Sequence, residues 1–184
     1  MKPVKLFEQF IAEKEGDAYE YGCVMLHFDF PQIKDIHAQI AEEDLYTEEE
    51  DRSYGLEDES HCTLLYGLHE EVTPEEIKEI VSKFKFENCK ATNLSLFEND
   101  YDVLKFDIVG DNLHECNEEL AKLPHTNKFP DYNPHMTIAY LKKGKGAKYV
   151  NMFEGDTFQD IPLAPQFTSY STAQGAKIKM TTNS

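Results

Sequence analysis

Apolar and polar residues form two kinds of pattern along this chain, and each kind predicts one type of element. Alternation with a period of two, or a dense run of aliphatic and aromatic residues, predicts β-strands. These stretches are residues 19–30, 61–68, 92–97, 103–109, 135–141, 167–171 and 176–180. Apolar residues three or four positions apart predict amphipathic helices at residues 33–40, 73–84 and 112–123. The order strand, helix, strand occurs twice, which predicts an α+β fold with two pseudo-symmetric βαβ-like halves.

Three segments lie outside this pattern. Residues 1–16 are amphipathic and predict an added N-terminal helix. Residues 42–60 are rich in Asp and Glu and lack apolar periodicity, which predicts a flexible, solvated acidic loop, with a lid over a site as the alternative. Residues 142–148 are rich in lysine and glycine and predict a basic loop that is either simply solvated or guides phosphates. The chain has 184 residues, a length that fits one domain over residues 1–184.

The net charge of −17 narrows the class of partner. A chain this acidic, with Arg52 as its single arginine, is not expected to bind double-stranded nucleic acid. A small phosphorylated substrate held by a few local groups is compatible with this charge. No run reaches the roughly 18 apolar residues of a membrane span, and no signal peptide is recognisable. The sequence therefore predicts a cytoplasmic protein with no membrane partner, and it leaves the oligomeric state open.

The cysteines are scattered along the chain and form no C-x-x-C pair. They are Cys23, Cys62, Cys89 and Cys116. A disulfide framework is unusual in a chain long enough to bury a core of its own. We expect reduced and mostly buried cysteines.

A short motif occurs twice, each time inside an apolar stretch predicted to be a strand. His61 and Thr63 begin one stretch, and His135 and Thr137 begin the other. Since side chains in a strand alternate between its two faces, each histidine shares a face with its threonine. A tyrosine follows each threonine after two residues, at positions 66 and 140. The same alternation predicts that these tyrosines face away from the histidines and pack in the core.

Two histidines and two threonines that converge on one cleft can act on a phosphodiester. One imidazole can take a proton from an attacking hydroxyl or water while the other protonates the leaving oxygen, because an ordinary histidine pKa is about 6.5. The threonine hydroxyls can bind the non-bridging phosphate oxygens. The chain shows none of the usual ligand spacings of a metal site, so neither a metal nor another cofactor is expected.

The doubled His-x-Thr motif at His61/Thr63 and His135/Thr137 resembles that of the two-histidine (2H) phosphoesterase superfamily. Pro134 and Tyr140 also fit the common pattern around the second motif. This superfamily includes 2′-5′ RNA ligase-like proteins, cyclic phosphodiesterases and phage nucleases of the anti-CBASS type, which cleave cyclic-oligonucleotide defence signals. The resemblance implies a bilobal fold with antiparallel sheets around a central cleft, and metal-independent chemistry in which these two histidines and two threonines are the catalytic residues.

The predicted function is thus a phosphodiesterase acting on a small nucleotide or short oligonucleotide. The candidates are a 2′,3′-cyclic phosphate, a 2′-5′ linkage and a cyclic oligonucleotide, the last as substrate of a phage enzyme in the host cytoplasm. Tyr21 and Tyr132 can stack on a base, and an ordinary surface aromatic is the alternative for both. The competing functions are a nucleotide-binding module without turnover and an RNA end-processing or 2′-5′ ligase-like protein.

Overall fold

The fold is seen in a computed structural model that describes residues 20–47, 54–127, 129, 131–153 and 158–181. The strands are β1 (Gly22–Asp29), β2 (His61–Leu68), β3 (Lys90–Glu98), β4 (Tyr101–Val109), β5 (His135–Lys142), β6 (Ile161–Pro162), β7 (Ala164–Ser171) and β8 (Lys177–Thr181). The helices are α2 (Ile33–His37), the 3₁₀ turn η1 (Glu42–Asp44), α3 (Pro74–Val81), α4 (Leu113–Leu120) and α5 (Ala147–Met152). The helix predicted at residues 1–16 lies outside the described residues.

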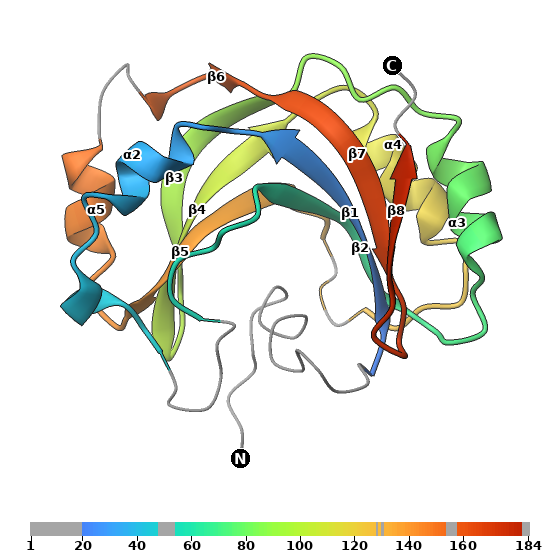
Figure 1. Ribbon diagram of the computed structural model, residues 1–184, viewed down its shortest axis with the longest axis horizontal. Coiled ribbons are helices and arrows are strands. Elements are labelled where there is room, and N and C mark those ends of the chain that lie inside the picture. Colours follow the sequence, from blue (N-terminus) through green and yellow to red (C-terminus); the bar gives the residue numbers. More distant parts are fainter. Residues whose placement is uncertain (1–19, 48–53, 128, 130, 154–157, 182–184) are drawn as a thin grey trace.

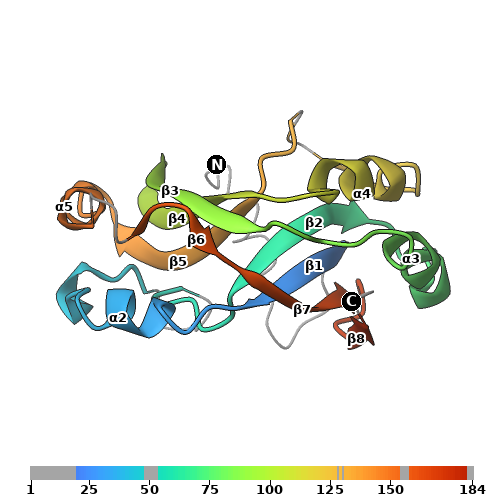
Figure 2. The ribbon, with the colours of Figure 1, turned by 90° about the horizontal axis from the view of Figure 1, so that it is seen from above.

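The strands form two four-stranded antiparallel sheets, one in each lobe. Their orders are β2-β1-β7-β8 in lobe A and β5-β4-β3-β6 in lobe B. Strands β2 and β5 are the edge strands that meet, packed against each other, where the lobes join. Together the sheets curl into an arch (Figure 1), and the view from above shows the lobes side by side (Figure 2). The predicted bilobal α+β architecture is therefore confirmed.

Each lobe is covered by a helix that the other half of the chain supplies. Helix α2 follows β1 of lobe A yet packs on β5 of lobe B. Helix α4 follows β4 of lobe B yet packs on β2 of lobe A. Figure 1 shows α2 beside α5 on the lobe B flank and α4 beside α3 on the lobe A flank. This exchange ties the two His-x-Thr strands to elements from both halves of the sequence.

The main hydrophobic core fills the space between the sheets and the helices. Helix α3 illustrates how a short helix is stabilised at this position. Its N-cap is Thr73, whose side chain accepts from the Glu76 amide at 3.2 Å while the Glu76 carboxylate accepts from the Thr73 amide at 2.8 Å. Ile77 and Val81 then turn one apolar stripe into the core. We call the sheet surface turned away from the helices the inner face.

Described residues of the two charged segments contribute to the fold, and part of the prediction for the basic segment is wrong. Within the acidic segment, the Tyr46 amide donates to the Tyr140 carbonyl at 2.9 Å and the Glu57 amide donates to the Ile138 carbonyl at 3.0 Å, so both residues bind the edge of β5. Asp44 is buried, where it accepts a 2.5 Å hydrogen bond from the Tyr149 hydroxyl and contacts the Lys148 ammonium. Part of the basic segment is not loop but the start of α5, whose buried residue is Tyr149. A six-residue helix is too short to show its period in sequence.

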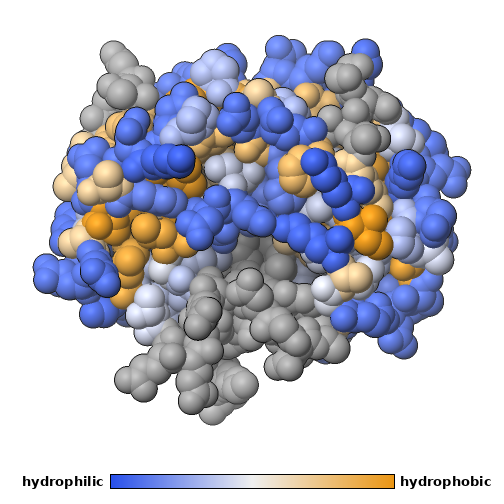
Figure 3. Space-filling model, viewed as in Figure 1, coloured by the Kyte–Doolittle hydropathy of each residue, from blue (hydrophilic) through white to orange (hydrophobic). Residues whose placement is uncertain are grey.

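Polar and charged side chains cover most of the molecular face seen in Figure 3, with apolar groups gathered towards the two flanks. This distribution accords with the strongly negative net charge. All four cysteines are buried and none forms a disulfide, as predicted. Among the described residues, no helix is both long enough and apolar enough to cross a bilayer.

Candidate functional site

The two His-x-Thr motifs begin the two edge strands that meet at the centre of the molecule. His61 and Thr63 open β2, and His135 and Thr137 open β5. All four side chains are at least nine-tenths buried. The strand register places them on the inner face, because their cross-strand partners include Met25 in lobe A, which lies outside the main core. Strands β2 and β5 pack against each other, so both motifs begin strands that meet where the lobes join.

Both strands contain a β-bulge directly after the threonine. In lobe A, Val24 pairs with Leu65 and Met25 pairs with Thr63, so Leu64 is an extra residue. In lobe B, Leu104 pairs with Ala139 and Lys105 pairs with Thr137, so Ile138 is the extra one. The two residues after each threonine consequently both point into the main core. They are Leu64, Leu65, Ile138 and Ala139.

The bulges overturn the prediction for the two tyrosines. Because each strand gains one residue, Tyr66 and Tyr140 return to the face that carries the histidines. Neither tyrosine belongs to the main core. Tyr66 packs with Cys23 and Met25, and Tyr140 belongs to an aromatic cluster on the inner face of lobe B. Simple alternation failed because it assumes an unbroken strand.

The two imidazoles are held in the same way. His61 Nδ1 lies 3.1 Å from the carbonyl oxygen of Glu59, and His135 Nδ1 lies 2.7 Å from that of Asn133. A carbonyl can only accept, so Nδ1 carries the proton and, in the neutral ring, Nε2 carries the lone pair. The same carbonyl is also satisfied when the ring is protonated. Each ring can therefore take up or release a proton at Nε2 while its Nδ1 contact holds.

The two threonine hydroxyls are buried polar atoms of an unusual kind. Thr63 is 5% exposed and Thr137 is 1% exposed. Within the described part of the chain, neither Oγ1 has a hydrogen-bond partner. A buried hydroxyl without a partner destabilises a protein by about 1–3 kcal/mol. The arrangement fits hydroxyls that bind an oxygen of a ligand.

A third histidine stands beside the first motif. His27 lies opposite His61 across β1 and β2, with 5.8 Å between the ring centroids. Its other side stacks on Phe167 at 4.4 Å, and its Nε2 lies 2.8 Å from the hydroxyl oxygen of buried Ser169. Burial, with the nearby His61 charge, lowers the pKa of His27 to about 4. His27 is therefore neutral at physiological pH.

An ion pair closes the lobe A side of this group. Both Glu59 carboxylate oxygens accept from Lys177 Nζ at 2.9 Å. Burial alone would raise the pKa of Glu59, but the Lys177 hydrogen bond and charge outweigh it and lower that pKa. Next to this pair, Lys179 Nζ lies 4.4 Å from the centroid of the Phe167 ring. Two lysines thus border the inner face near His61.

The second motif has different neighbours. The residue opposite His135 is Asp107, whose carboxylate lies 2.6 Å from Lys105 Nζ. The Phe97 and His135 rings form a T-shaped pair, with 4.9 Å between their centroids. Lys105 Nζ lies 4.5 Å from the centroid of the same Phe97 ring. His135 therefore lies beside the Lys105–Asp107 ion pair and the Phe97 ring, whereas His61 lies beside a second imidazole, that of His27.

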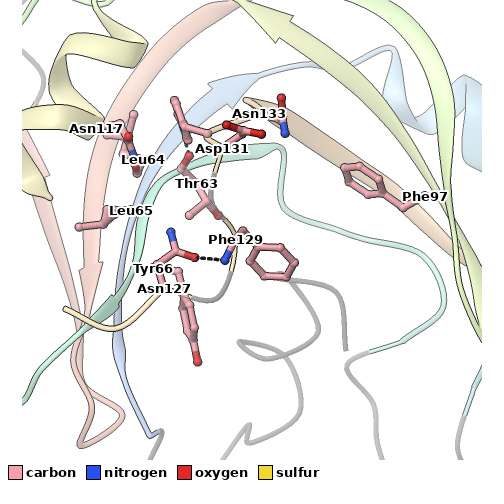
Figure 4. A pocket seen from close by; sticks show the side chains of 11 residues that line it. Thr63, Leu64, Leu65, Tyr66, Phe97, Asn117, Asn127, Phe129, Asp131 and Asn133 are labelled. Atoms are coloured by element: carbon pink, nitrogen blue, oxygen red, sulfur yellow. Dashed lines mark hydrogen bonds between the residues drawn. The ribbon is translucent and has the colours of Figure 1, made fainter. Parts of the chain in front are cut away.

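A pocket opens on the inner face directly beside Thr63 (Figure 4). Its volume is about 180 Å³, and its walls come from β2, from Asn117 of α4, from Phe97 of lobe B and from the segment before β5. That segment contributes Phe129, whose amide donates to the Asn127 side chain at 2.9 Å. The pocket offers aromatic surface, together with the polar groups of Asn127 and Asn133. These are the properties of a site for a flat ring with hydrogen-bonding edges.

The two tyrosines predicted to stack on a base lie in different places. The Tyr132 ring lines the pocket, and burial raises the pKa of Tyr132 well above its ordinary value. Its hydroxyl donates to the Thr63 carbonyl at 2.9 Å, so its polar end is committed to the fold. Tyr21 is part of another group, in which its ring meets Tyr66 edge-on at 6.0 Å and stacks on His69 at 5.9 Å.

Sequence reasoning missed several members of this site. His27 and Lys105 become neighbours of the motifs only through strand pairing, although alternation along their strands places them on the inner face. Phe129 stands in an irregular segment with no periodic signal. In the described ranges, no three His, Cys, Asp or Glu side chains cluster closely enough to hold a metal ion.

Three comparisons with known proteins bear on this site. A family model described as "Anti-CBASS protein Acb1" matches residues 55–162, more than half of the chain and both motifs. Among solved structures, Usb1 of Kluyveromyces marxianus superposes with a TM-score of 0.53 at 9% identity, over 88% of this chain and 98% of that one. At that identity the likeness concerns the fold alone. No curated protein matches.

Proposed function

The chain belongs to the Acb1 family of anti-CBASS proteins, and from this premise we propose that it is a two-histidine phosphodiesterase that cleaves a small cyclic or 2′-5′-linked nucleotide. The observation that carries the proposal is the matched pair of motifs. Each has an imidazole fixed through Nδ1 and a buried threonine hydroxyl with no partner in the described residues. Two such pairs on adjoining strands suit one phosphate between them.

In the proposed mechanism, the two histidines act on opposite sides of the phosphorus. The Nε2 of one imidazole takes the proton of the attacking hydroxyl or water, and the Nε2 of the other donates a proton to the leaving oxygen. Thr63 and Thr137 donate hydrogen bonds to the non-bridging oxygens, where negative charge increases in the transition state. The site also holds the attacking and leaving oxygens in line with the phosphorus, and this alignment contributes to the rate.

The pocket beside Thr63 is proposed to hold a base of the substrate. Phe129 and Tyr66 offer aromatic surface for stacking, and stacking of this kind contributes about 1–3 kcal/mol per base. Asn127 and Asn133 offer amide groups at the rim for the polar edge of the ring. In the family's setting, the substrate is a cyclic oligonucleotide defence signal in the cytoplasm of an infected host. The other candidates are a 2′,3′-cyclic phosphate and a 2′-5′ dinucleotide.

The test is a digest with chelator present and four substrates: a 2′,3′-cyclic mononucleotide, a 2′-5′ dinucleotide, a 3′-5′ RNA and a 3′,3′-cyclic dinucleotide. Each is incubated with the wild-type protein and with His61→Ala, His135→Ala and His125→Ala. His125 is the matched control, because its Nδ1 also contacts the carbonyl two residues earlier, at 2.9 Å, but it lies on neither motif strand. We expect one substrate to be cleaved by the wild type and the control only.

Two results would contradict the proposal. Binding of a substrate that is then recovered intact would leave the alternative of a nucleotide-binding module. Cleavage that survives both motif substitutions would place the chemistry elsewhere.

A further inference from the structure

The two bulges need hydrogen-bond partners, because a bulge leaves backbone groups outside the sheet ladder. In lobe A, the carbonyl of the extra residue Leu64 accepts from the Asn117 side-chain amide at 2.7 Å. In lobe B, the carbonyl of the extra residue Ile138 accepts from His37 Nε2 at 2.9 Å. The same structural position in each strand is thus bound by one side chain from a helix.

These two side chains come from the exchanged helices. Asn117 lies on α4, which follows β4 of lobe B, and it binds the bulge in lobe A. His37 is the last residue of α2, which follows β1 of lobe A, and it binds the bulge in lobe B. The contacts are therefore reciprocal across the pseudo-two-fold arrangement. Neither was expected from the sequence, where both residues are isolated polar positions on amphipathic helices.

We propose that Asn117 and His37 are positioning residues for the reaction, each fixing the His-x-Thr strand of the opposite half through its bulge; this inference rests on the proposed function. The bulge directly follows Thr63 or Thr137, so a change in the bulge carbonyl moves the threonine hydroxyl and turns the following tyrosine. Displacements near 1 Å can reduce a rate by about 100-fold. Neither side chain is assigned a proton-transfer role, and Asn117 also lines the pocket beside Thr63.

Each strand has one further contact at this point. The Tyr132 hydroxyl donates to the Thr63 carbonyl at 2.9 Å, and the Glu57 amide donates to the Ile138 carbonyl at 3.0 Å. These contacts keep the bulges formed when one helix side chain is replaced. A substitution of Asn117 or His37 should then loosen the strand without unfolding the lobe.

The test is a set of double-mutant cycles that looks for crossed coupling. Asn117→Leu and His37→Leu each remove the donor, and each is combined in turn with Thr63→Val and Thr137→Val. We expect each donor substitution alone to lower kcat about 10- to 100-fold. KM should change less than about 3-fold for His37→Leu, whereas Asn117→Leu should also raise KM, because Asn117 lines the pocket beside Thr63. Asn117→Leu should add little to Thr63→Val but multiply the effect of Thr137→Val. His37→Leu should show the opposite pattern, and His37→Gln, which keeps a donor, should restore most of the rate.

The controls are Glu118→Gln on α4 and Lys34→Gln on α2, both exposed positions of the same helices. A second measurement is independent of turnover: the imidazole NMR signals of His61 and His135. Asn117→Leu should shift the His61 signals and leave those of His135, and His37→Leu should do the reverse. The inference would be overturned if the losses of kcat multiplied in all four double mutants. It would also be overturned if each helix substitution shifted the NMR signals of both histidines equally. A wild-type protein that cleaves nothing but shows the crossed shifts would instead remove the proposed function.

Discussion

The two His-x-Thr strands share a motif, a bulge and a histidine contact, yet they face different surroundings. Beside β2, Tyr66 borders an open pocket. Beside β5, the matching Tyr140 is covered by Tyr54, whose ring meets it edge-on at 5.6 Å. Tyr46 and Tyr101 complete this second group and stack on each other at 4.5 Å. One half of a nearly symmetric site is thus open and the other is filled.

The residues opposite the two histidines differ in the same way. His27 stands opposite His61, and Asp107, paired with Lys105, stands opposite His135. The groups to which the proposed function assigns proton transfer are thus duplicated, while their surroundings are not. If the proposed function holds, a symmetric pair of acid–base groups would act on an asymmetric ligand in one direction.

The largest loss of activity is expected at the two histidines, which both halves share. His61→Ala and His135→Ala should each lower kcat by about 10²–10⁴-fold, because each removes one proton-transfer group. Initial rates on the cleaved substrate, followed by chromatography of the products, provide the measurement. If one substitution left kcat within a few-fold of the wild type, the two halves would not share the chemistry.

The threonines should separate activity from stability. Thr63→Val and Thr137→Val remove hydroxyls that are buried without partners in the described residues, so each should lower kcat by about 10²–10³-fold. Each should also leave the free energy of unfolding unchanged or raise it by about 1 kcal/mol, since a buried polar group is removed. Urea unfolding of the same preparations measures the second quantity. A loss of both activity and stability would mean that these hydroxyls serve the fold.

The aromatic groups should sharpen the contrast between the open and the filled half. Tyr54→Ala empties a position that is 6% exposed, so it should cost about 3–5 kcal/mol of unfolding free energy. Phe129→Ala changes a pocket wall and should raise KM about 10-fold, with a loss of stability below about 1 kcal/mol. Thermal unfolding of both variants measures the loss of stability, and steady-state kinetics measure the change in KM. Equal losses of stability and equal changes in KM in the two variants would contradict the contrast between the open and the filled half.

A further effect concerns acid sensitivity, which should lie in lobe A. Burial first, and then the neighbouring His61 charge, lowers the pKa of His27 from 6.5 to about 4. The unfolded chain therefore binds more protons between these values, so the stabilising contribution is complete above pH 6.5 and is lost as the pH falls towards 4. The loss is at most about 3 kcal/mol.

His27→Gln should flatten this part of the stability profile while keeping a polar group near Ser169. Urea unfolding at pH 7 and at pH 4.5 measures the difference. His125→Gln, which removes a histidine from outside the two motif strands, is the matched control. An unchanged pH slope in His27→Gln would show that the sensitivity arises elsewhere.

The sequence by itself determined the strands and the resemblance, and it predicted the chemistry. The apolar runs at 61–68 and 135–141 match β2 and β5 almost residue for residue. The doubled His-x-Thr motif pointed to four side chains on one face. These features are local, because periodicity and motif spacing depend only on neighbouring residues.

Only the tertiary structure decided where the tyrosines point, which helix covers which sheet and which half of the site is open. The bulges at Leu64 and Ile138 shift each strand by one residue, and their carbonyls are bound by Asn117 and His37 from distant parts of the chain. Such contacts leave no period in the sequence. A single inserted position reverses every later side chain of a strand, so alternation alone could not predict the faces of Tyr66 and Tyr140.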